Sequence, residues 1–171
     1  MTFTELAQEV LNRCGEGFQD YIERAGEHLK KNIEDLINNG AMGEADYPGL
    51  IVEYLDAYSV TIPLSSFFGS ESYQLLKIMS VLVDDVKIDL ISNAEYDVSA
   101  KLGSLFSKGY IYRSGEIQFV GIVSASGVRI RLVKRFVPAT TEEDMLDSFT
   151  LRFIDALTDL TVQTLYKEIN S

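Results

Sequence analysis

Few residues in this sequence have side chains suited to nucleophilic, general-base or soft-metal chemistry. His28 is the single histidine and Cys14 the single cysteine among 171 residues. A catalytic or metal-binding histidine needs partners, and no second His or Cys accompanies His28. Cys14 lacks a CxxC partner, so a small buried apolar side chain is a simpler interpretation than a nucleophile. We expect His28 at a surface or boundary and Cys14 in a packed position.

Carboxylates are more numerous and form two short clusters. Asp84, Asp85 and Asp89 could bind a hard cation. Their spacing does not match an EF-hand loop, and alternation along a strand points Asp84 and Asp85 apart, so we prefer a solvated turn. Residues 142–144 are all acidic and could form a catalytic pair. They also fit the first turn of a helix, where negative charge suits the helix dipole.

Glycines and hydroxyl residues also lack a catalytic context. The glycines of the second half fall at breaks between elements and form no GxGxxG or phosphate-binding loop; they are Gly103, Gly109, Gly115, Gly121 and Gly127. No serine lies in a GxSxG sequence. The sequence therefore predicts a protein that is not an enzyme and that carries no cofactor and no metal.

One basic cluster contrasts with an acidic background. It comprises Arg129, Arg131, Lys134 and Arg135, with Arg113 as a further candidate. Two interpretations stay open: these side chains pair with neighbouring carboxylates along a strand, or they contact an acidic partner protein or a DNA backbone.

Composition limits the possible partners and locations. The net charge of −11 argues against a protein that wraps nucleic acid around itself, because that mode of binding requires clustered Lys and Arg. The same negative charge would suit a surface past which DNA slides without binding. No apolar run approaches the ~20 residues that span a bilayer, and the start MTFTELAQEV does not resemble a signal peptide. We expect a soluble protein that is made in the cytoplasm, has no membrane partner and has no internal disulfide.

Both ends of the chain show helical patterns. Thr2 followed by Glu5 matches a capping box and predicts a short helix from Phe3. A strong amphipathic pattern predicts a second helix over 18–37. For residues 50–58 we prefer a short helix, because their apolar residues keep helical spacing, although a strand stays open.

The middle of the chain alternates as strands do. Strands are predicted at 79–83 and 86–90 around the Asp84-Asp85 turn, in a hairpin over 109–121, and at 127–137, where Pro138 ends the strand. Residues 59–64 are expected to be extended and 94–105 to form a short helix. The predicted fold class is α+β, a helical bundle with a small antiparallel β-sheet inserted in its middle.

The length predicts a single domain over 1–171. Its helical part would cover residues 1–60, its β-rich part residues 61–138, and its C-terminal helix residues 140–169. That last helix would begin at Thr140 or Thr141.

The C-terminal helix carries apolar residues on two sides. At ~100° per residue, one stripe contains Phe149, Phe153, Ala156, Leu157 and Leu160. The second stripe contains Leu151, Ile154, Val162, Leu165 and Ile169. Thr161 falls in a polar strip between the two. Two stripes imply two packing partners: either the helix is central within one subunit, or its second stripe contacts a neighbouring subunit.

The order of segments resembles the head–tail connector adaptors of tailed bacteriophages, also called neck or head-completion proteins. The resemblance runs through TELAQEVLNRCGE, FQDYIERAGEHLKKNIEDLI, SVTIPLSSF, KIMSVLVDDVKIDLISNAEYD, GYIYRSGEIQFVG, GVRIRLVKRFVPATTEEDM and FTLRFIDALTDLTVQTLYKEI. It covers most of the chain and lies in element order and in the run DALTDLTVQTLY, without a motif of fixed residues.

The resemblance implies a structural role in the virion neck. The family forms a ring, usually twelvefold, that joins the portal protein to the tail or to the next neck protein. Genomic DNA passes through the ring without sequence-specific binding. We hypothesise that Arg113, Ser114 and Gly115 form a contact tip on such a ring. Two alternatives stay open: another virion part such as a tail-completion protein, and a small soluble enzyme or ligand-binding domain with an unrecognised site.

Overall fold

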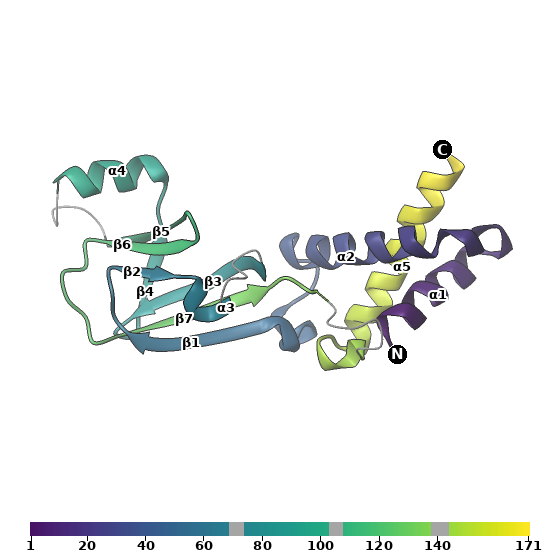
Figure 1. Cartoon of the computed structure of the whole chain (residues 1–171), viewed down its shortest axis with the longest axis horizontal. Helices are drawn as coiled ribbons and strands as arrows, with labels where there is room; N and C mark the ends of the chain where they lie inside the picture. Colours follow the sequence, from purple (N-terminus) through teal and green to yellow (C-terminus); the bar gives the residue numbers. More distant parts are fainter. Residues whose placement is uncertain (69–73, 103–107, 138–143) are drawn as a thin grey trace. The chain divides into compact units, whose positions relative to one another are not determined.

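The computed structural model describes residues 1–68, 74–102, 108–137 and 144–171. It contains two compact units (Figure 1). A helical unit combines residues 1–51 with 135–171, and a strand unit comprises residues 52–134. The two ends of the chain therefore form one unit and the middle forms the other. The expected single domain stays a prediction.

In the part of the helical unit that the structure describes, three α-helices each pack against the other two: α1 (Phe3–Cys14), α2 (Ile22–Asn38) and α5 (Leu151–Asn170). Short 3₁₀ turns lie between them, at Glu16–Tyr21, Glu44–Asp46, Pro48–Leu50 and Met145–Asp147. The helix predicted over 18–37 is thus a 3₁₀ turn followed by α2.

The predicted start of α1 is confirmed in atomic detail. The Glu5 amide donates to the Thr2 hydroxyl at 3.1 Å, and the Thr2 amide donates to the Glu5 carboxylate at 2.8 Å. These two bonds satisfy amide groups that the helix itself leaves unpaired. The helix ends before Gly15, whose φ of 111° lies in the region that glycine tolerates best.

Aromatic side chains fill one end of the helical core. The Phe149 and Phe153 rings stack at 4.5 Å, and Phe136 meets Phe149 edge-on at 5.2 Å. Phe3 joins this cluster through Phe136. The aliphatic stripe of α2 continues the core, with Ala25, Leu29, Ile33, Leu36 and Ile37 buried. Its spacing of three or four residues is the one that predicted this helix.

The predicted start of the last helix is wrong. α5 begins at Leu151, where the Thr150 hydroxyl accepts from the Phe153 amide at 3.3 Å. Residues 138–143, where the helix was expected to start, lie outside the described residues. Asp144 instead accepts from the Leu146 amide at 3.0 Å and caps the 3₁₀ turn that precedes α5.

The described residues of the strand unit form seven strands. They are β1 (Ile51–Ala57, whose first residue belongs to the helical unit), β2 (Thr61–Pro63), β3 (Leu75–Val83), β4 (Val86–Leu90), β5 (Gly109–Arg113), β6 (Glu116–Val120) and β7 (Gly127–Lys134). Their order across the sheet is β1-β7-β3-β4-β5-β6-β2. Two short helices accompany them, α3 (Ser65–Phe68) and α4 (Asn93–Leu102).

This sheet contradicts the predicted fold class of a small inserted antiparallel sheet. β4 and β5 run parallel, so the seven-stranded sheet is mixed. Residues 91–108, which contain α4, supply the long crossover that a parallel pair requires. The helix expected at 94–105 is confirmed up to Leu102, with the Ser92 hydroxyl accepting from the Glu95 amide at 3.2 Å. Residues 103–107 lie outside the description.

The helix preferred for residues 50–58 is also wrong, because β1 occupies most of that segment. Tyr54 packs edge-on against Phe67 with their ring centroids 4.1 Å apart. The helical spacing of the apolar residues was therefore coincidental, and contacts distant in sequence determine the strand.

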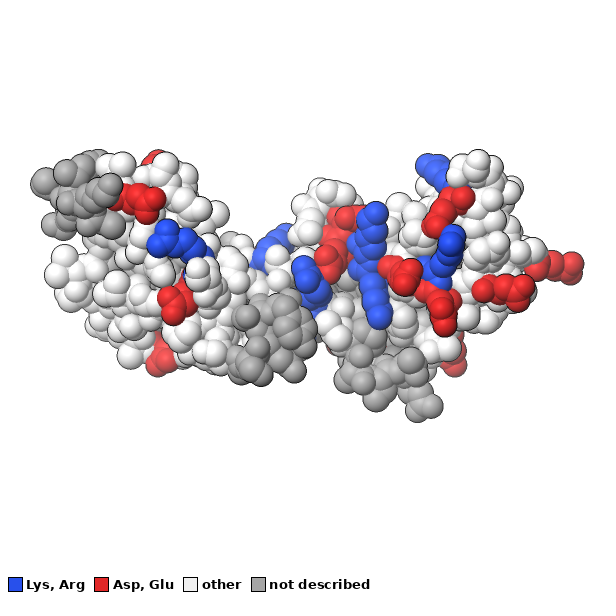
Figure 2. All heavy atoms as spheres, turned by 45° about the horizontal axis from the view of Figure 1, so that its top comes forward, with Lys and Arg blue, Asp and Glu red and all other residues white. Residues whose placement is uncertain are grey.

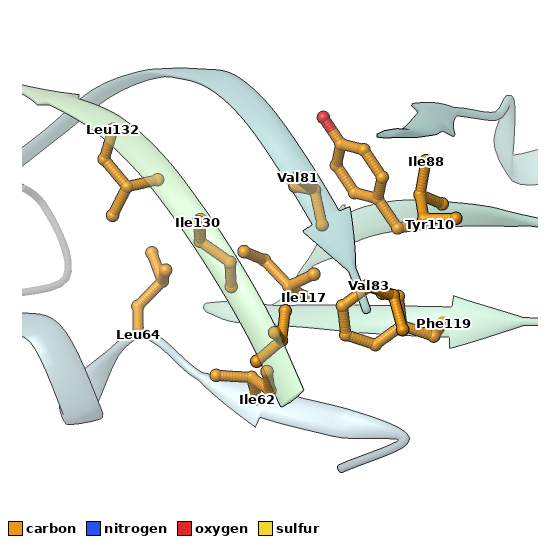
Figure 3. Close-up of a cluster of buried hydrophobic side chains, with 11 residues drawn as sticks. Ile62, Leu64, Val81, Val83, Ile88, Tyr110, Ile117, Phe119, Ile130 and Leu132 are labelled. Atoms are coloured by element: carbon orange, nitrogen blue, oxygen red, sulfur yellow. The ribbon is translucent and has the colours of Figure 1, made fainter. Parts of the chain in front are cut away.

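Chain connectivity forces the sheet to curve into a half-barrel. β1 and β2 lie at opposite edges of the sheet order, yet only residues 58–60 join them. Such a link reaches about 14 Å, whereas six strand spacings in a flat sheet would span about 29 Å. The enclosed face holds a core of Ile62, Leu64, Val81, Val83, Ile88, Tyr110, Ile117, Phe119, Val128, Ile130 and Leu132 (Figure 3).

Candidate functional site

The α5 helix has one broad buried face instead of two separate stripes. Its buried residues are Phe153, Ile154, Leu157, Thr158, Thr161 and Leu165, which span an arc of about 140°. Thr161 lies near the middle of this arc, although the sequence placed it in a polar strip. Its hydroxyl donates to the Leu157 carbonyl at 2.7 Å, which removes the penalty for burying it.

The five predicted interface residues of α5 have different environments. Ile154 and Leu165 are covered by the chain itself, at 4% and 0% exposure. Val162 and Ile169 are half-buried. Leu151 is 66% exposed and stands next to exposed Arg152 at the start of the helix. A subunit contact by this helix therefore stays a prediction, for which Leu151 is the most accessible member.

The predicted contact tip at residues 113–115 is a tight hairpin turn between β5 and β6. Ser114 and Gly115 have φ values of 54° and 77°, as a type I′ turn requires. The Gly115 carbonyl accepts from the Leu64 amide at 2.8 Å, which holds the turn against the sheet. Arg113 lies 3.7 Å from Asp97 and over the Tyr96 ring, so α4 restrains its side chain.

Two arginines of the basic cluster, Arg129 on β7 and Arg135 just after it, lie beside carboxylates. Arg129 reaches Asp85 at 3.5 Å and Glu53 at 3.9 Å. Arg131 also has an interaction partner within the chain. In the helical unit, Arg135 pairs with Glu34 at 2.7 Å. On the face in Figure 2, acidic and basic side chains are intermixed over the helical unit. For Arg129 and Arg135 this arrangement agrees with the first interpretation, in which the side chains balance neighbouring carboxylates.

The acidic turn between β3 and β4 organises a neighbouring loop. The Asp84 carboxylate accepts from the amides of Ser126 and Gly127, both at 2.9 Å. Asp84 and Asp85 have φ values of 48° and 64°, which again indicates a type I′ turn. Asp85 borders an open hollow of about 220 Å³ that Arg129 also lines. Within the described residues, no three His, Cys, Asp or Glu side chains group closely enough to hold a metal ion.

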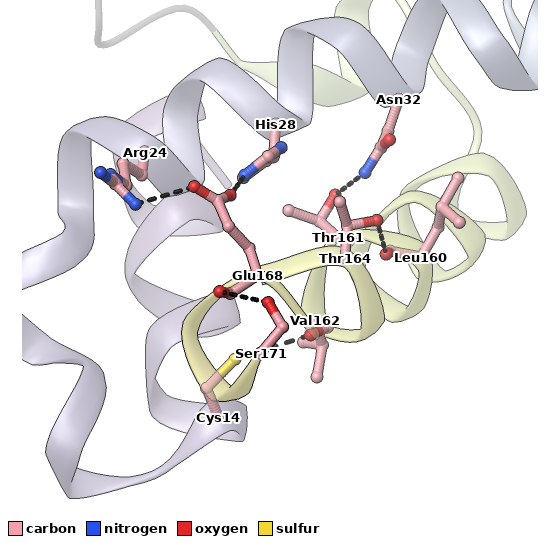
Figure 4. Close-up of polar contacts among 10 residues, drawn as sticks. All are labelled: Cys14, Arg24, His28, Asn32, Leu160, Thr161, Val162, Thr164, Glu168 and Ser171. Atoms are coloured by element: carbon pink, nitrogen blue, oxygen red, sulfur yellow. Dashed lines mark hydrogen bonds and ion pairs between the residues drawn. The ribbon is translucent and has the colours of Figure 1, made fainter. Parts of the chain in front are cut away.

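A polar ladder connects α2 to α5 (Figure 4). Arg24 and His28 both contact the Glu168 carboxylate, with the Arg24 guanidinium at 2.7 Å. One turn further on, the buried Asn32 amide donates to the Thr161 hydroxyl at 3.0 Å. His28 is thus a half-buried boundary residue, as expected, and its imidazole helps to align the two helices.

The partners in this ladder were missed by the sequence reasoning. Arg24, His28 and Asn32 follow one another at intervals of four residues on α2, and Thr161 and Glu168 are seven apart on α5. Matching polar positions at helical spacing on two amphipathic helices could have suggested that they face each other.

Cys14 is partly buried at the end of α1. Its thiol lies 3.9 Å from the Val162 carbonyl, and burial raises the pKa of the thiol. A raised pKa disfavours the thiolate that a nucleophile needs. The observed position agrees with the expected packing role.

A groove of about 360 Å³ runs between α1 and the first half of α2. Apolar atoms of Phe3, Ala7, Ile22 and Gly26 line its floor, and Glu23, Glu27 and Lys30 stand along its edge. The Lys30 ammonium lies 5.8 Å from the centre of the Phe3 ring. Nothing in the composition of these helices singled out this groove, because it depends on how they pack.

Comparison with known proteins leaves these sites without a relative to interpret them by. No protein-family model matches the chain, and no curated protein sequence matches it either. Among the described residues, no helix is both long enough and apolar enough to span a bilayer. The surfaces of the two units are therefore the features from which a function can be inferred.

Proposed function

We propose that this chain is a head–tail connector adaptor of a tailed bacteriophage. In this proposal, identical copies form a ring, twelvefold in the resembling family, in the neck of the virion. The ring joins the portal protein to the tail or to the next neck protein, and genomic DNA passes through it without sequence-specific binding. The chain has a structural role and no catalytic one.

The observation that carries the proposal is that both units display large apolar side chains. Leu151 is 66% exposed on the helical unit, and on the strand unit Leu55, Leu90 and Val123 are 63%, 65% and 85% exposed. A single exposed leucine is ordinary, but a protein covered on several sides by neighbours needs apolar contacts on several surfaces. A connector subunit has such neighbours: two copies of itself and the rings above and below.

The charge distribution also supports the proposal. The net charge of −11 opposes adhesion to DNA that must move past the protein. Arg129 and Arg135 stand beside carboxylates, which reduces their availability to phosphates.

A mixing experiment tests the proposal. The purified chain would be combined with the portal ring encoded near its gene, and the product mass would be measured by light scattering and its symmetry by negative-stain imaging. We expect a discrete complex with one ring of this chain on each portal. If the mass of the portal ring stays unchanged at every concentration of added chain, the proposal is contradicted. That result would favour a ligand-binding domain or a different virion part.

A further inference from the structure

Gly26 lies inside α2, where the chain's own fold does not require a glycine. Glycine destabilises a helix interior relative to alanine. A Cβ atom at Gly26 would meet only one heavy atom within 4 Å, the Phe3 Cε1 at 3.6 Å, which is an ordinary contact. Its φ is also not in the left-handed region. The fold therefore tolerates a larger residue, and the missing side chain instead keeps the floor of the α1/α2 groove open.

The edge of this groove carries a net negative charge, because Glu23 and Glu27 outnumber Lys30 there. Glu23 and Glu27 are exposed and one helical turn apart, a spacing at which like charges repel. Within the described part of the chain, neither forms an ion pair. An apolar floor with an acidic edge fits an occupant that presents an apolar side chain next to a basic one.

The start of α5 has this combination. Leu151 is 66% exposed, and the side chain of Arg152 is 74% exposed. The Arg152 guanidinium is 3.7 Å from the Asp46 carboxylate, whose side chain is only 10% exposed. That carboxylate also accepts from the Gly43 amide and the Thr150 hydroxyl, so it keeps partners when Arg152 turns outward. The residues that line the groove all belong to α1 and α2, and none belongs to α5. The Leu151–Arg152 pair and the groove are therefore different surfaces of one helical unit.

We propose that the α1/α2 groove binds the start of α5 from a second copy of this chain. Leu151 of one copy lies over Gly26 of the next, and Arg152 approaches Glu23 and Glu27. The contact joins two different surfaces, so it is heterologous and propagates from copy to copy until a ring closes. This contact deepens the proposed connector function, since it supplies the interface between neighbouring subunits of the ring.

Directional disulfide trapping tests the contact. Cys14→Ser removes the native thiol, and Gly26→Cys and Leu151→Cys are placed in two separately tagged chains. On mild oxidation, alone and with the portal ring present, we expect a mixed disulfide dimer in clear excess over either homodimer. Gly17→Cys replaces Gly26→Cys in the control, because Gly17 is an exposed helical glycine away from the groove. A mixed product no more abundant than in the control, with and without portal, would overturn the contact.

Substitution of Gly26 separates stability from association. Gly26→Ala should raise the thermal unfolding midpoint by about 2–4 °C. Gly26→Leu should abolish the trapped dimer formed through Leu151→Cys and a reporter thiol at Thr4→Cys, because Thr4 is exposed and lines the groove without belonging to the charge pair. Gly17→Leu is the matched control and should leave that dimer intact. A folded Gly26→Leu chain that still gives the full yield of dimer would contradict the assigned groove.

Charge exchange provides an independent test by sedimentation equilibrium at high protein concentration. Arg152→Glu and Glu27→Arg should each weaken self-association up to about fivefold, and the double variant should recover most of the loss. Unchanged association in both single variants would refute the charge pairing and with it the choice of occupant.

The connector function and the groove contact can fail separately. A ring of copies on the portal without the Gly26–Leu151 disulfide would leave the connector function standing and remove the groove contact. The reverse result, trapped heterologous dimers without portal binding, would support the contact and contradict the connector function.

Discussion

Two leucines of α5 provide a direct test of how the helical unit is packed. Leu165 and Leu151 belong to the same predicted stripe, but Leu165 is 0% and Leu151 66% exposed. We expect Leu165→Ala to reduce the free energy of unfolding strongly and Leu151→Ala to change it little. The two substitutions remove the same atoms from the same helix, so each is the other's control.

The difference in magnitude follows from burial. Leu165→Ala loses the transfer free energy of a fully buried side chain and leaves a cavity, together about 2–5 kcal/mol. Full burial of a leucine is worth about 1.5–3 kcal/mol, so the third of Leu151 that is covered contributes at most about 0.5–1 kcal/mol. Alanine's slightly better helix propensity offsets part of that smaller loss.

Urea denaturation followed by far-ultraviolet circular dichroism measures both values, because the helical unit dominates the helical signal. The variants should be compared at a low protein concentration, where copies of the chain do not associate. A loss below about 1 kcal/mol for Leu165→Ala, or an equal loss for both variants, would show that the described packing of α5 is incorrect.

Three further predictions concern single polar groups. Asp84→Gly should destabilise the strand unit by about 1–2 kcal/mol, because the Ser126 and Gly127 amides lose a charged acceptor. Asp85→Gly should be neutral or stabilising, since relief of the positive φ of 64° outweighs the loss of an exposed ion pair with Arg129. Urea denaturation that ranks the two variants in the opposite order would disprove this account. Thr161→Val should lower stability by about 1–3 kcal/mol by leaving the buried Asn32 amide without its acceptor, and a double-mutant cycle with Asn32→Leu that shows no coupling would contradict it. Burial raises the pKa of the Tyr110 phenol above its value in the unfolded chain, with a smaller effect from the Asp89 carboxylate. The stabilising contribution of Tyr110 is therefore complete below the ordinary tyrosine pKa and is lost as the pH rises through the pKa of the folded state. Ultraviolet titration of the wild type should therefore show one phenol that ionises above the ordinary tyrosine pKa and that is missing in Tyr110→Phe. If the phenol missing in Tyr110→Phe ionises at the ordinary tyrosine pKa, the raised pKa of Tyr110 is refuted.

Local signals made several elements predictable. The Thr2–Glu5 capping box defined the start of α1, and the amphipathic period of α2 identified its buried stripe. Asp84-Asp85 and Ser114-Gly115 adopt the positive φ values that two-residue hairpin turns require. In each case the residues that decide the structure are close in sequence, so the pattern could be recognised without knowledge of the fold.

Long-range pairing explains the main errors. β1 was mistaken for a helix because its partners, β7 and the Phe67 ring, are distant in sequence. The parallel β4–β5 pair depends on a crossover that no short pattern reveals. The same limit applies to the candidate site: Leu151 and Arg113 could be named from sequence, but the α1/α2 groove exists only once the two helices are packed.

The threonines of α5 show why hydrophobic periodicity misjudged its faces. Thr158 and Thr161 are 2% and 0% exposed, with hydroxyls donating to carbonyls one turn earlier. A threonine that satisfies its hydroxyl within its own helix can join an apolar surface. Counting Thr161 as polar divided one buried face into two apparent stripes and suggested two packing partners. The exposed residues at the beginning of α5, and not a second apolar stripe, are therefore the part of this helix that a second copy could contact.

The path of the chain allows the two units to serve different neighbours. The end of β1 lies beside the start of β7, since the Tyr58 amide donates to the Ser126 carbonyl at 3.3 Å. These strands are neighbours in the sheet, so the beginning of β1 lies near the end of β7, and the chain enters and leaves the strand unit at adjacent points. An insertion with adjacent ends leaves the host core intact. The three helices can then form a contact between identical copies, while the surface of the half-barrel changes to suit a different partner without disturbing the residues that hold the helices together.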